Sequence, residues 1–175
     1  MLSTQKEESS SDNRAERVVN LAKPQEPPEL PKKILVAIDG SENSMRALET
    51  SKLLAKVYKS ELEMLSVLQT PVSVIGNPSM NGVFWDEYFA KGKAETEKWL
   101  DQLVKSAEEE GIEACAKIVE ESPSVVGSIV DTAQAEDADL IVIGTRGLGG
   151  FRRLVLGSVS SGVAGHAHCD VLVVR

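Results

Sequence analysis

Short apolar runs alternate with amphipathic segments along most of the chain. Five of these runs predict strands: Ile34–Ile38, Leu62–Leu68, Ile112–Val119, Leu140–Ile143 and Val171–Val174. The first, a continuous apolar run, is typical of a strand buried on both faces. The segments between them carry apolar residues at the helical spacing of about 3.6. Because strand and helix alternate, the pattern predicts one α/β domain, with a doubly wound, mostly parallel five-stranded sheet and helices on both faces.

Two serines are predicted to begin helices. Ser41 follows the first apolar run and can cap a helix whose apolar stripe is Ala47, Leu48, Ser51, Leu54, Ala55 and Tyr58. Ser122 is predicted to cap a later helix, with Pro123 at the first helical position.

Two segments fall outside the predicted elements. Residues 1–31 are rich in Ser, Glu, Lys, Asn and Pro and are predicted to be a disordered tail, so the folded domain is predicted to span residues 32–175. A short apolar patch at residues 18–22 leaves docking on a partner open as an alternative. Residues 69–83 are predicted to form a long loop, and loops of this length often act as lids.

Composition and charge narrow the function. The 175 residues include 27 acidic and 19 basic side chains, and the net charge of -8 at pH 7 disfavours nucleic acid and anionic membrane surfaces as partners. No apolar run approaches the ~20 residues needed to span a bilayer, and the N-terminus lacks a secretory signal. Cys115 and Cys169 show neither CxxC nor metal-ligand spacing. We therefore expect a cytoplasmic protein with no nucleic acid and no membrane partner.

Candidate chemistry concentrates in residues 144–158, which follow the fourth predicted strand. This segment has five glycines in fifteen positions. Glycines leave backbone N–H groups uncovered, and Ser158 and Ser160 lie where the next helix begins, so the segment can form a cradle for phosphate. Three arginines add positive charge: Arg146, Arg152 and Arg153. The alternative is a flexible surface loop with solvated arginines.

The carboxyl ends of the other predicted strands offer fewer polar groups. Ligands of doubly wound sheets bind at these ends, which directs attention to Asp39 and Val67. The Asp39 carboxylate can accept a hydrogen bond from a ligand hydroxyl or amine, and its alternative role is to cap the first helix. The P-loop motif GxxxxGK[ST] is absent because the only Gly-Lys pair, Gly92-Lys93, is followed by Ala94, and GxGxxG is absent as well.

The glycine spacing resembles a family signature. The pattern Gly144-x2-Gly147-x9-Gly157-Ser158 matches G-2x-G-9x-G-[S/T], the ATP-binding motif of the universal stress protein family. Three further segments are similar to parts of that family: Ile34–Ser44, Ala138–Gly147 and Cys169–Val174. The resemblance covers about residues 32–175, and it implies an ATP-binding member of the family with strand order 3-2-1-4-5.

The resemblance also implies roles for individual residues. Asp39 and the backbone at Val67 would contact the adenosine end of ATP, ADP or AMP. Ala37 would line the adenine pocket, and Gly144 would lie near the ribose. The phosphates, with a Mg²⁺ or Mn²⁺ ion bridging their oxygens, would be held by Gly147, Gly157, Ser158, Val159 and Ser160.

The last strand and helix complete what the resemblance implies. Relatives pair the closing strand antiparallel about a two-fold axis, so a homodimer through Val171–Val174 is expected. Two residues depart from the family pattern, since Ser66 stands where many members carry a histidine and Asp170 replaces the usual proline. Gly162 and Gly165 are each expected to weaken the last helix by ~1 kcal/mol relative to Ala.

Three functions remain open from the sequence. A nucleotide-dependent stress-response or signalling module is favoured, because no His, Glu or Lys in the glycine motif is placed to act as a base. A slow ATPase or phosphotransfer enzyme is the second, with at most weak ATP hydrolysis expected. The third is a dimeric interaction protein that the bound nucleotide stabilises.

Overall fold

The computed structural model describes residues 29–69, 82–148 and 156–175. Most of the predicted tail, most of the predicted long loop and the predicted cationic residues Arg152 and Arg153 lie outside the described residues. Within the described part of the chain, no helix is long and apolar enough to cross a membrane.

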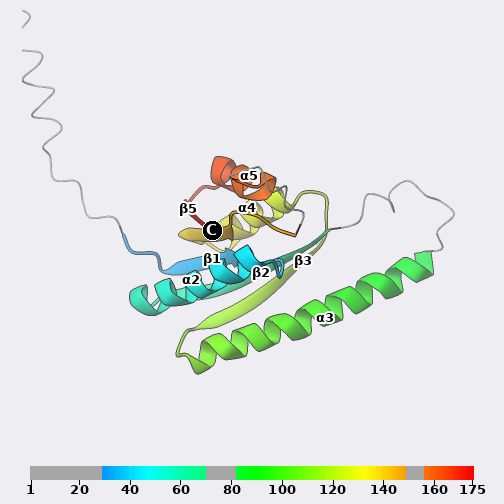
Figure 1. Ribbon diagram of the computed structural model, residues 1–175, viewed down its shortest axis with the longest axis horizontal. Helices are drawn as coiled ribbons and strands as arrows, with labels where there is room; N and C mark the ends of the chain where they lie inside the picture. Colours follow the sequence, from blue (N-terminus) through cyan, green and yellow to red (C-terminus); the bar gives the residue numbers. More distant parts are fainter. Residues whose placement is uncertain (1–28, 70–81, 149–155) are drawn as a thin grey trace, which may run out of the picture.

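Five parallel strands form one sheet (Figure 1). They are β1 (Lys33–Ala37), β2 (Glu61–Gln69), β3 (Ala114–Ser122), β4 (Leu140–Gly144) and β5 (Asp170–Val174). Their order across the sheet is β3-β2-β1-β4-β5, and every pair of neighbours is parallel. This confirms the predicted strand order and topology. Because the order reverses between β1 and β4, a ligand is expected at the carboxyl ends of these two strands.

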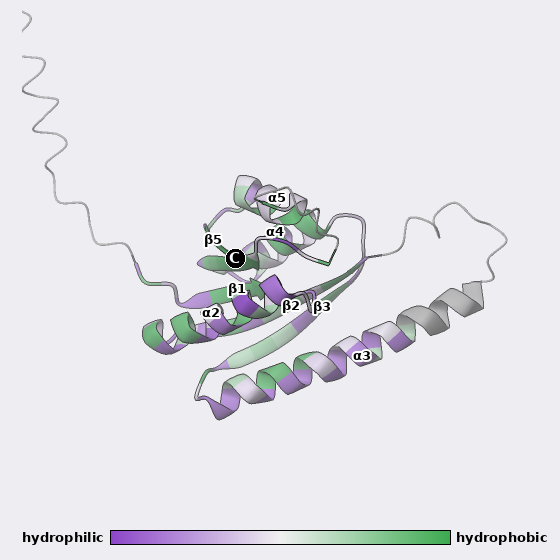
Figure 2. Cartoon of the chain, in the orientation of Figure 1, coloured by the Kyte–Doolittle hydropathy of each residue, from purple (hydrophilic) through white to green (hydrophobic). Residues whose placement is uncertain are grey.

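Helices cover both faces of the sheet. They are α2 (Glu42–Tyr58), α3 (Gly82–Glu109), α4 (Val125–Ala135) and α5 (Ser158–His166). Figure 1 shows α2 and α3 on one face and α4 and α5 on the other. Apolar and polar positions alternate along α2 and α3 (Figure 2), as expected of helices that bury one face. The two edges of the sheet are β3 and β5.

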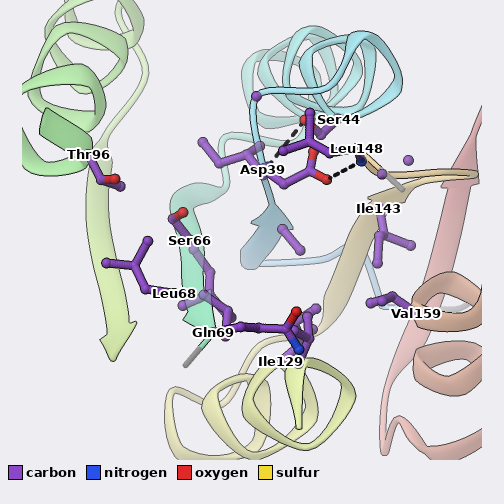
Figure 3. A pocket seen from close by; sticks show the side chains of 18 of the residues that line it. Asp39, Ser44, Ser66, Leu68, Gln69, Thr96, Ile129, Ile143, Leu148 and Val159 are labelled. Carbon is purple, nitrogen blue, oxygen red and sulfur yellow. Dashed lines mark hydrogen bonds between the residues drawn. The ribbon is translucent and has the colours of Figure 1, made fainter. Parts of the chain in front are cut away.

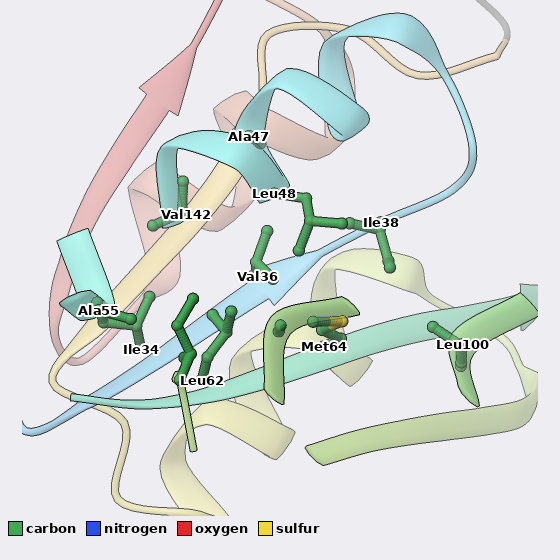
Figure 4. Close-up of a cluster of buried hydrophobic side chains, with 12 residues drawn as sticks. Ile34, Val36, Ile38, Ala47, Leu48, Ala55, Leu62, Met64, Leu100 and Val142 are labelled. Carbon is green, nitrogen blue, oxygen red and sulfur yellow. The ribbon is translucent and has the colours of Figure 1, made fainter. Parts of the chain in front are cut away.

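Alternate residues of the central strands build two separate cores. Ile34 and Val36 of β1 pack with Met64 against α2 and α3 (Figure 4). Leu35 and Ala37, which alternate with them along β1, pack instead against α4 and α5. Ile34, Leu35 and Val36 are each 0% exposed. Burial on both faces explains why β1 is a continuous apolar run rather than an alternating one.

The structure confirms one predicted helix start and corrects the other. Ser41 is the N-cap of α2, and its side chain accepts a hydrogen bond from the N–H of Ser44 at 3.2 Å. Ser122, the predicted cap of the later helix, is the last residue of β3. The N-cap of α4 is Ser124, which accepts from the N–H of Gly127 at 3.1 Å. Pro123 therefore lies before the cap, outside the helix.

Candidate functional site

A cleft of about 1220 Å³ opens at the carboxyl ends of the strands (Figure 3). Its walls come from the ends of β1, β2 and β4, the start of α5, and α3 and α4. All nine site residues predicted from the sequence line it: Ala37, Asp39, Val67, Gly144, Gly147, Gly157, Ser158, Val159 and Ser160. The fold therefore brings together residues that lie more than a hundred positions apart in the chain.

Sequence reasoning missed the part of the cleft that α3 and α4 supply. Lys91, Lys93 and Trp99 of α3 line it, as does Ile129 of α4. No motif marks these residues, and their helical periodicity indicates only which face of each helix is buried. Ser66, which stands where many members of the resembled family carry a histidine, also lines the cleft and is 5% exposed.

Apolar side chains form one wall of the cleft. Ala37 and Ile143 are 8% and 6% exposed, and Ile129 is 2% exposed. All three belong to the core between the sheet and α4 and α5. Figure 3 shows Ile143 and Val159 on one side of the cleft and Ile129 on α4 below it. Such a surface suits the flat, apolar face of a heterocyclic base.

Asp39 follows β1 and turns toward the glycine-rich segment. Its Oδ1 accepts a hydrogen bond from the N–H of Ser41 at 3.0 Å, and its Oδ2 accepts one from the N–H of Leu148 at 3.1 Å. Burial raises the pKa of this carboxyl, but hydrogen bonds from Ser41, Ser44 and Leu148 favour the ionised form, and the pKa lies below its usual value. Asp39 thus stabilises the turn after β1 through Ser41 and also bonds to the loop after β4 through Leu148. The cap of α2 is Ser41, not Asp39.

The chain reverses direction between β1 and α2 at Gly40. Its φ of +79° lies in the left-handed region that favours glycine. The turn brings Ser41 and Asn43 onto the β4 loop, where Ser41 Oγ and Asn43 Nδ2 both donate to the carbonyl oxygen of Arg146 at 3.3 Å. The turn after β1 and the loop after β4 are therefore hydrogen-bonded to each other.

The three glycines of the motif lie where protein atoms approach closely. A Cβ at Gly144 would lie 2.7 Å from the backbone carbon of Asn43, and one at Gly157 would lie 2.9 Å from the carbonyl oxygen of Thr145. A Cβ at Gly147 would overlap Asp39 Oδ2. In this structure the motif spacing thus has a packing cause, in addition to any contact with a ligand.

The N-terminus of α5 faces the cleft. Ser158, Val159 and Ser160 are its first three residues, so their N–H groups have no partner within the helix. The first helical bond runs from the N–H of Ser161 to the oxygen of Gly157 at 2.9 Å. Aligned peptide dipoles add positive potential here, and a helix start of this kind suits a phosphate.

The two predicted hydroxyls at this helix start differ in their surroundings. Ser158 is exposed. Ser160 is 2% exposed, and its hydroxyl can donate to the oxygen of Thr145 at 3.0 Å or to that of Gly157 at 3.1 Å. The Ser160 hydroxyl is therefore used within the protein, whereas the Ser158 hydroxyl faces solvent.

Basic and acidic side chains of α3 form the opposite rim. Lys91 lies 4.0 Å from Glu95, and Lys93 lies 2.6 Å from Glu120 of β3. The hydrogen bond to Glu120 raises the pKa of Lys93. Among the residues that the structure describes, no three His, Cys, Asp or Glu side chains gather in a way that could hold a metal ion.

Solved structures with the same fold are known. The structure of the hypothetical protein MJ0577 is 27% identical in sequence to this chain, with a TM-score of 0.73, over 83% of this chain and 96% of that one. The universal stress protein UspA from Lactobacillus plantarum is 26% identical, with a TM-score of 0.67, over 85% of this chain and all of that one.

More distant structures with this fold contain nucleotides. One is a universal stress protein in complex with cAMP, at 24% identity and a TM-score of 0.61. Another is the universal stress protein from Archaeoglobus fulgidus in complex with dAMP, and a third is a family protein from Arabidopsis thaliana with AMP bound. The last two are each 22% identical to this chain with TM-scores of 0.58, so the likeness is one of fold.

Sequence relatives establish the family. Universal stress protein YxiE of Bacillus subtilis is 36% identical over 149 residues, which cover 82% of this chain and 98% of that protein. Universal stress protein MJ0531 of Methanocaldococcus jannaschii is 35% identical over 144 residues, 82% of each chain. The universal stress protein family as a whole matches residues 31–175. This chain therefore belongs to the universal stress protein family.

Proposed function

We propose that this chain is an ATP-binding universal stress protein that acts as a nucleotide-dependent stress-response or signalling module. The observation that carries the proposal is the meeting, in one cleft, of an apolar wall, the Asp39 carboxylate and the open N-terminus of α5. These three features suit a base, a sugar hydroxyl and a phosphate in turn. The AMP, dAMP and cAMP bound to proteins of the same fold support an adenine nucleotide as the ligand class.

Each part of the nucleotide has a proposed partner. The adenine base lies against Ala37 and the backbone at Val67, with Ile129 and Ile143 behind it. Asp39 accepts a hydrogen bond from a hydroxyl of the ribose, near Gly144. The phosphates are held by Gly147 and Gly157, by the N–H groups of Ser158, Val159 and Ser160, and by the Ser158 hydroxyl.

A divalent cation would enter with the nucleotide. Mg²⁺ keeps several waters and is commonly held by substrate phosphates plus one or two protein oxygens. In the proposed site, the Mg²⁺ or Mn²⁺ ion is held through the phosphate oxygens. The hydroxyl of Ser158, which is exposed at the start of α5, is the protein oxygen that we propose for this ion.

Binding is proposed in preference to turnover. Hydrolysis at a useful rate needs a group that orients water or takes its proton. The carboxylates that line the described cleft are Asp39, which is bonded to two backbone N–H groups, and Glu95, which faces Lys91 at 4.0 Å. A slow ATPase that uses Glu95 remains the second candidate.

A cytoplasmic homodimer is part of the proposal. β5 is an edge strand, its central residue Leu172 is 36% exposed, and exposed strand edges invite pairing. Pairing of Val171–Val174 with a second copy would bury this edge. In that case the nucleotide could also act by stabilising the dimer, which is the third candidate.

One experiment separates the three candidates. The protein is purified, its bound nucleotide is identified after denaturation, and ATP binding with Mg²⁺ is measured by calorimetry alongside phosphate release. Binding without turnover supports the module, and steady release supports the enzyme. Nucleotide-dependent change in mass by light scattering supports the stabilised dimer. If neither ATP, ADP nor AMP binds, the proposed function is wrong.

A further inference from the structure

Asp39 lies after β1, yet it is bonded to the loop that follows β4. Figure 3 shows its carboxylate directed at the N–H of Leu148, the 3.1 Å bond described above. A carboxylate offers about four lone-pair sites. The N–H groups of Ser41 and Leu148 each bond to one of its oxygens, and Asp39 is exposed, so a ligand hydroxyl can still approach the carboxylate. One side chain can therefore hold the loop and contact adenosine together.

Two neighbours of Asp39 hold the same stretch of loop. Ser41 and Asn43 both bond to the carbonyl oxygen of Arg146, as described above. Gly147 lies between the two bonded loop residues, and its Cα faces Asp39 so closely that a Cβ would overlap Oδ2. The turn after β1 therefore fixes residues 146–148, which belong to the glycine-rich segment.

We propose that Asp39 is a positioning residue, which holds residues 146–148 in the conformation that receives phosphate. The proposal rests on the proposed nucleotide binding and deepens it. Glycine-rich backbone has high conformational freedom, and ordering it before the ligand arrives removes a cost from binding. Charge alone predicts the opposite effect, since a carboxylate repels phosphate. A ligand with phosphates and no adenosine therefore separates the two effects. Removal of the Asp39 carboxylate weakens its binding if positioning dominates and strengthens it if charge repulsion dominates.

Tripolyphosphate with Mg²⁺ is the probe, and calorimetry is the measurement. Asp39→Ala is expected to weaken tripolyphosphate binding by about fivefold to tenfold. Equal or tighter binding of tripolyphosphate, with weaker binding of adenosine, would show that Asp39 acts only as an adenosine contact and would overturn the proposal. Asp39→Asn keeps one acceptor oxygen for the N–H of Leu148 and is expected to restore part of the lost affinity.

Asp139 supplies a matched control. Its Oδ2 accepts the N–H groups of Lys32 and Lys33 at 2.7 and 2.9 Å, so it too ties two backbone amides. These bonds lie at the start of β1, at the opposite end of the strand from the cleft. Asp139→Ala is expected to leave tripolyphosphate affinity unchanged. A loss equal to that of Asp39→Ala would mean that general destabilisation, and not positioning, explains the effect.

A double-mutant cycle tests the contact between Asp39 and the loop. Gly147→Ala places its Cβ where Asp39 Oδ2 lies, so it displaces the carboxylate and is expected to weaken tripolyphosphate binding in the same way. The double variant is then expected to lose less affinity than the sum of the two single losses, because both changes break the contact between Asp39 and the loop. Fully additive losses would overturn the proposal.

Backbone relaxation measured by NMR keeps the proposal testable without any ligand. In Asp39→Ala, the order parameters of residues 146–148 are expected to fall towards values typical of flexible loops, while those of α2 and β4 stay rigid. If the wild-type protein binds neither tripolyphosphate nor adenosine, the proposed function is wrong. The order parameters then still test whether Asp39 holds residues 146–148. Unchanged order parameters at residues 146–148 would overturn the proposal.

Discussion

The hydroxyl of Ser160 donates a hydrogen bond to the carbonyl oxygen of Thr145 across 3.0 Å. The N–H of Gly157 bonds to the same oxygen at 2.8 Å, so the start of α5 is fixed to the end of β4 from two positions. Ser160 is 2% exposed, whereas Ser158, two residues earlier, is exposed. Of these two serines in one helical turn, Ser160 is therefore bonded within the protein, whereas Ser158 faces solvent.

This difference predicts opposite outcomes for two alanine substitutions. Ser160→Ala removes a buried hydrogen bond and is expected to lower the free energy of unfolding by about 1 kcal/mol. Ser158→Ala is expected to leave stability within about 0.5 kcal/mol and to weaken ATP binding roughly tenfold to hundredfold, because a bond to a charged phosphate is lost. Adenosine affinity should be spared. Urea unfolding and calorimetry on both variants measure the two effects, and equal effects on stability would contradict the assignment.

Two glycines of α5 give a second prediction with a built-in control. A Cβ at Gly162 would lie 2.7 Å from Val126 Cγ2 of α4, whereas a Cβ at Gly165 would meet nothing within 4 Å. Gly165→Ala is therefore expected to stabilise the protein by about 0.5–1 kcal/mol through helix propensity. Gly162→Ala is expected to destabilise it by about 1–3 kcal/mol, because α4 and α5 must separate. Thermal unfolding should show a higher melting temperature for Gly165→Ala and a lower one for Gly162→Ala than for the wild type.

The same pair shows where sequence reasoning reaches its limit. Propensity assigns both glycines the same cost, because it counts only the helix that contains them. The contact of Gly162 with Val126 depends on how α4 and α5 meet, which no local pattern records. Lys52 is a parallel case, since it is 6% exposed and pairs with Glu110, the residue that follows α3. Periodicity could not select that partner.

The α/β fold class was predictable from the strands themselves, whereas the strand order was predicted from the resemblance to the universal stress protein family. Residues of β1 and β4 are buried on both faces of the sheet, so each strand is an unbroken apolar run that can be recognised in the sequence. Their parallel arrangement then brings their carboxyl ends to one edge, which is why Asp39 and Gly147 meet across the cleft. The predicted role of the glycines was incomplete, because backbone of the same chain approaches Gly144 and Gly157 closely.

Removal of the predicted tail tests the domain boundary. Pro31 is part of the fold, because its carbonyl oxygen accepts a hydrogen bond from the Ser60 hydroxyl at 2.5 Å. A truncation that starts at Glu29 keeps this bond. We expect it to retain the melting temperature and ATP affinity of the full chain, since the composition of the tail cannot support a packed core. A loss of several degrees would instead indicate that residues 18–22 dock on the domain.

The exposed edge of the sheet tests the proposed dimer. Lys residues on an edge strand oppose pairing with a second chain. Leu172→Lys is therefore expected to convert the proposed homodimer into a monomer at micromolar concentration, as measured by light scattering. Ala116→Lys, at an exposed position on the opposite edge strand β3, serves as the control and should leave the mass unchanged. A monomeric wild-type protein would contradict the dimer itself.

Ionisation of Asp39 predicts a dependence of stability on pH. Its pKa in the folded protein lies below the usual 3.8, so the stability it contributes is fully present above pH 3.8 and is lost as pH falls through the folded pKa. At pH 7, Asp39→Asn is expected to lower the free energy of unfolding by about 1 kcal/mol or less, because Asp39 is only partly buried and solvent weakens its interactions. Once protonated, Asp39 resembles Asn in having one acceptor oxygen and one donor group. The stability difference between wild type and variant, measured by urea unfolding from pH 7 to pH 3, should therefore shrink towards zero at the acid end. A difference that stays constant over this range would show that the charge of Asp39 contributes nothing to holding the loop.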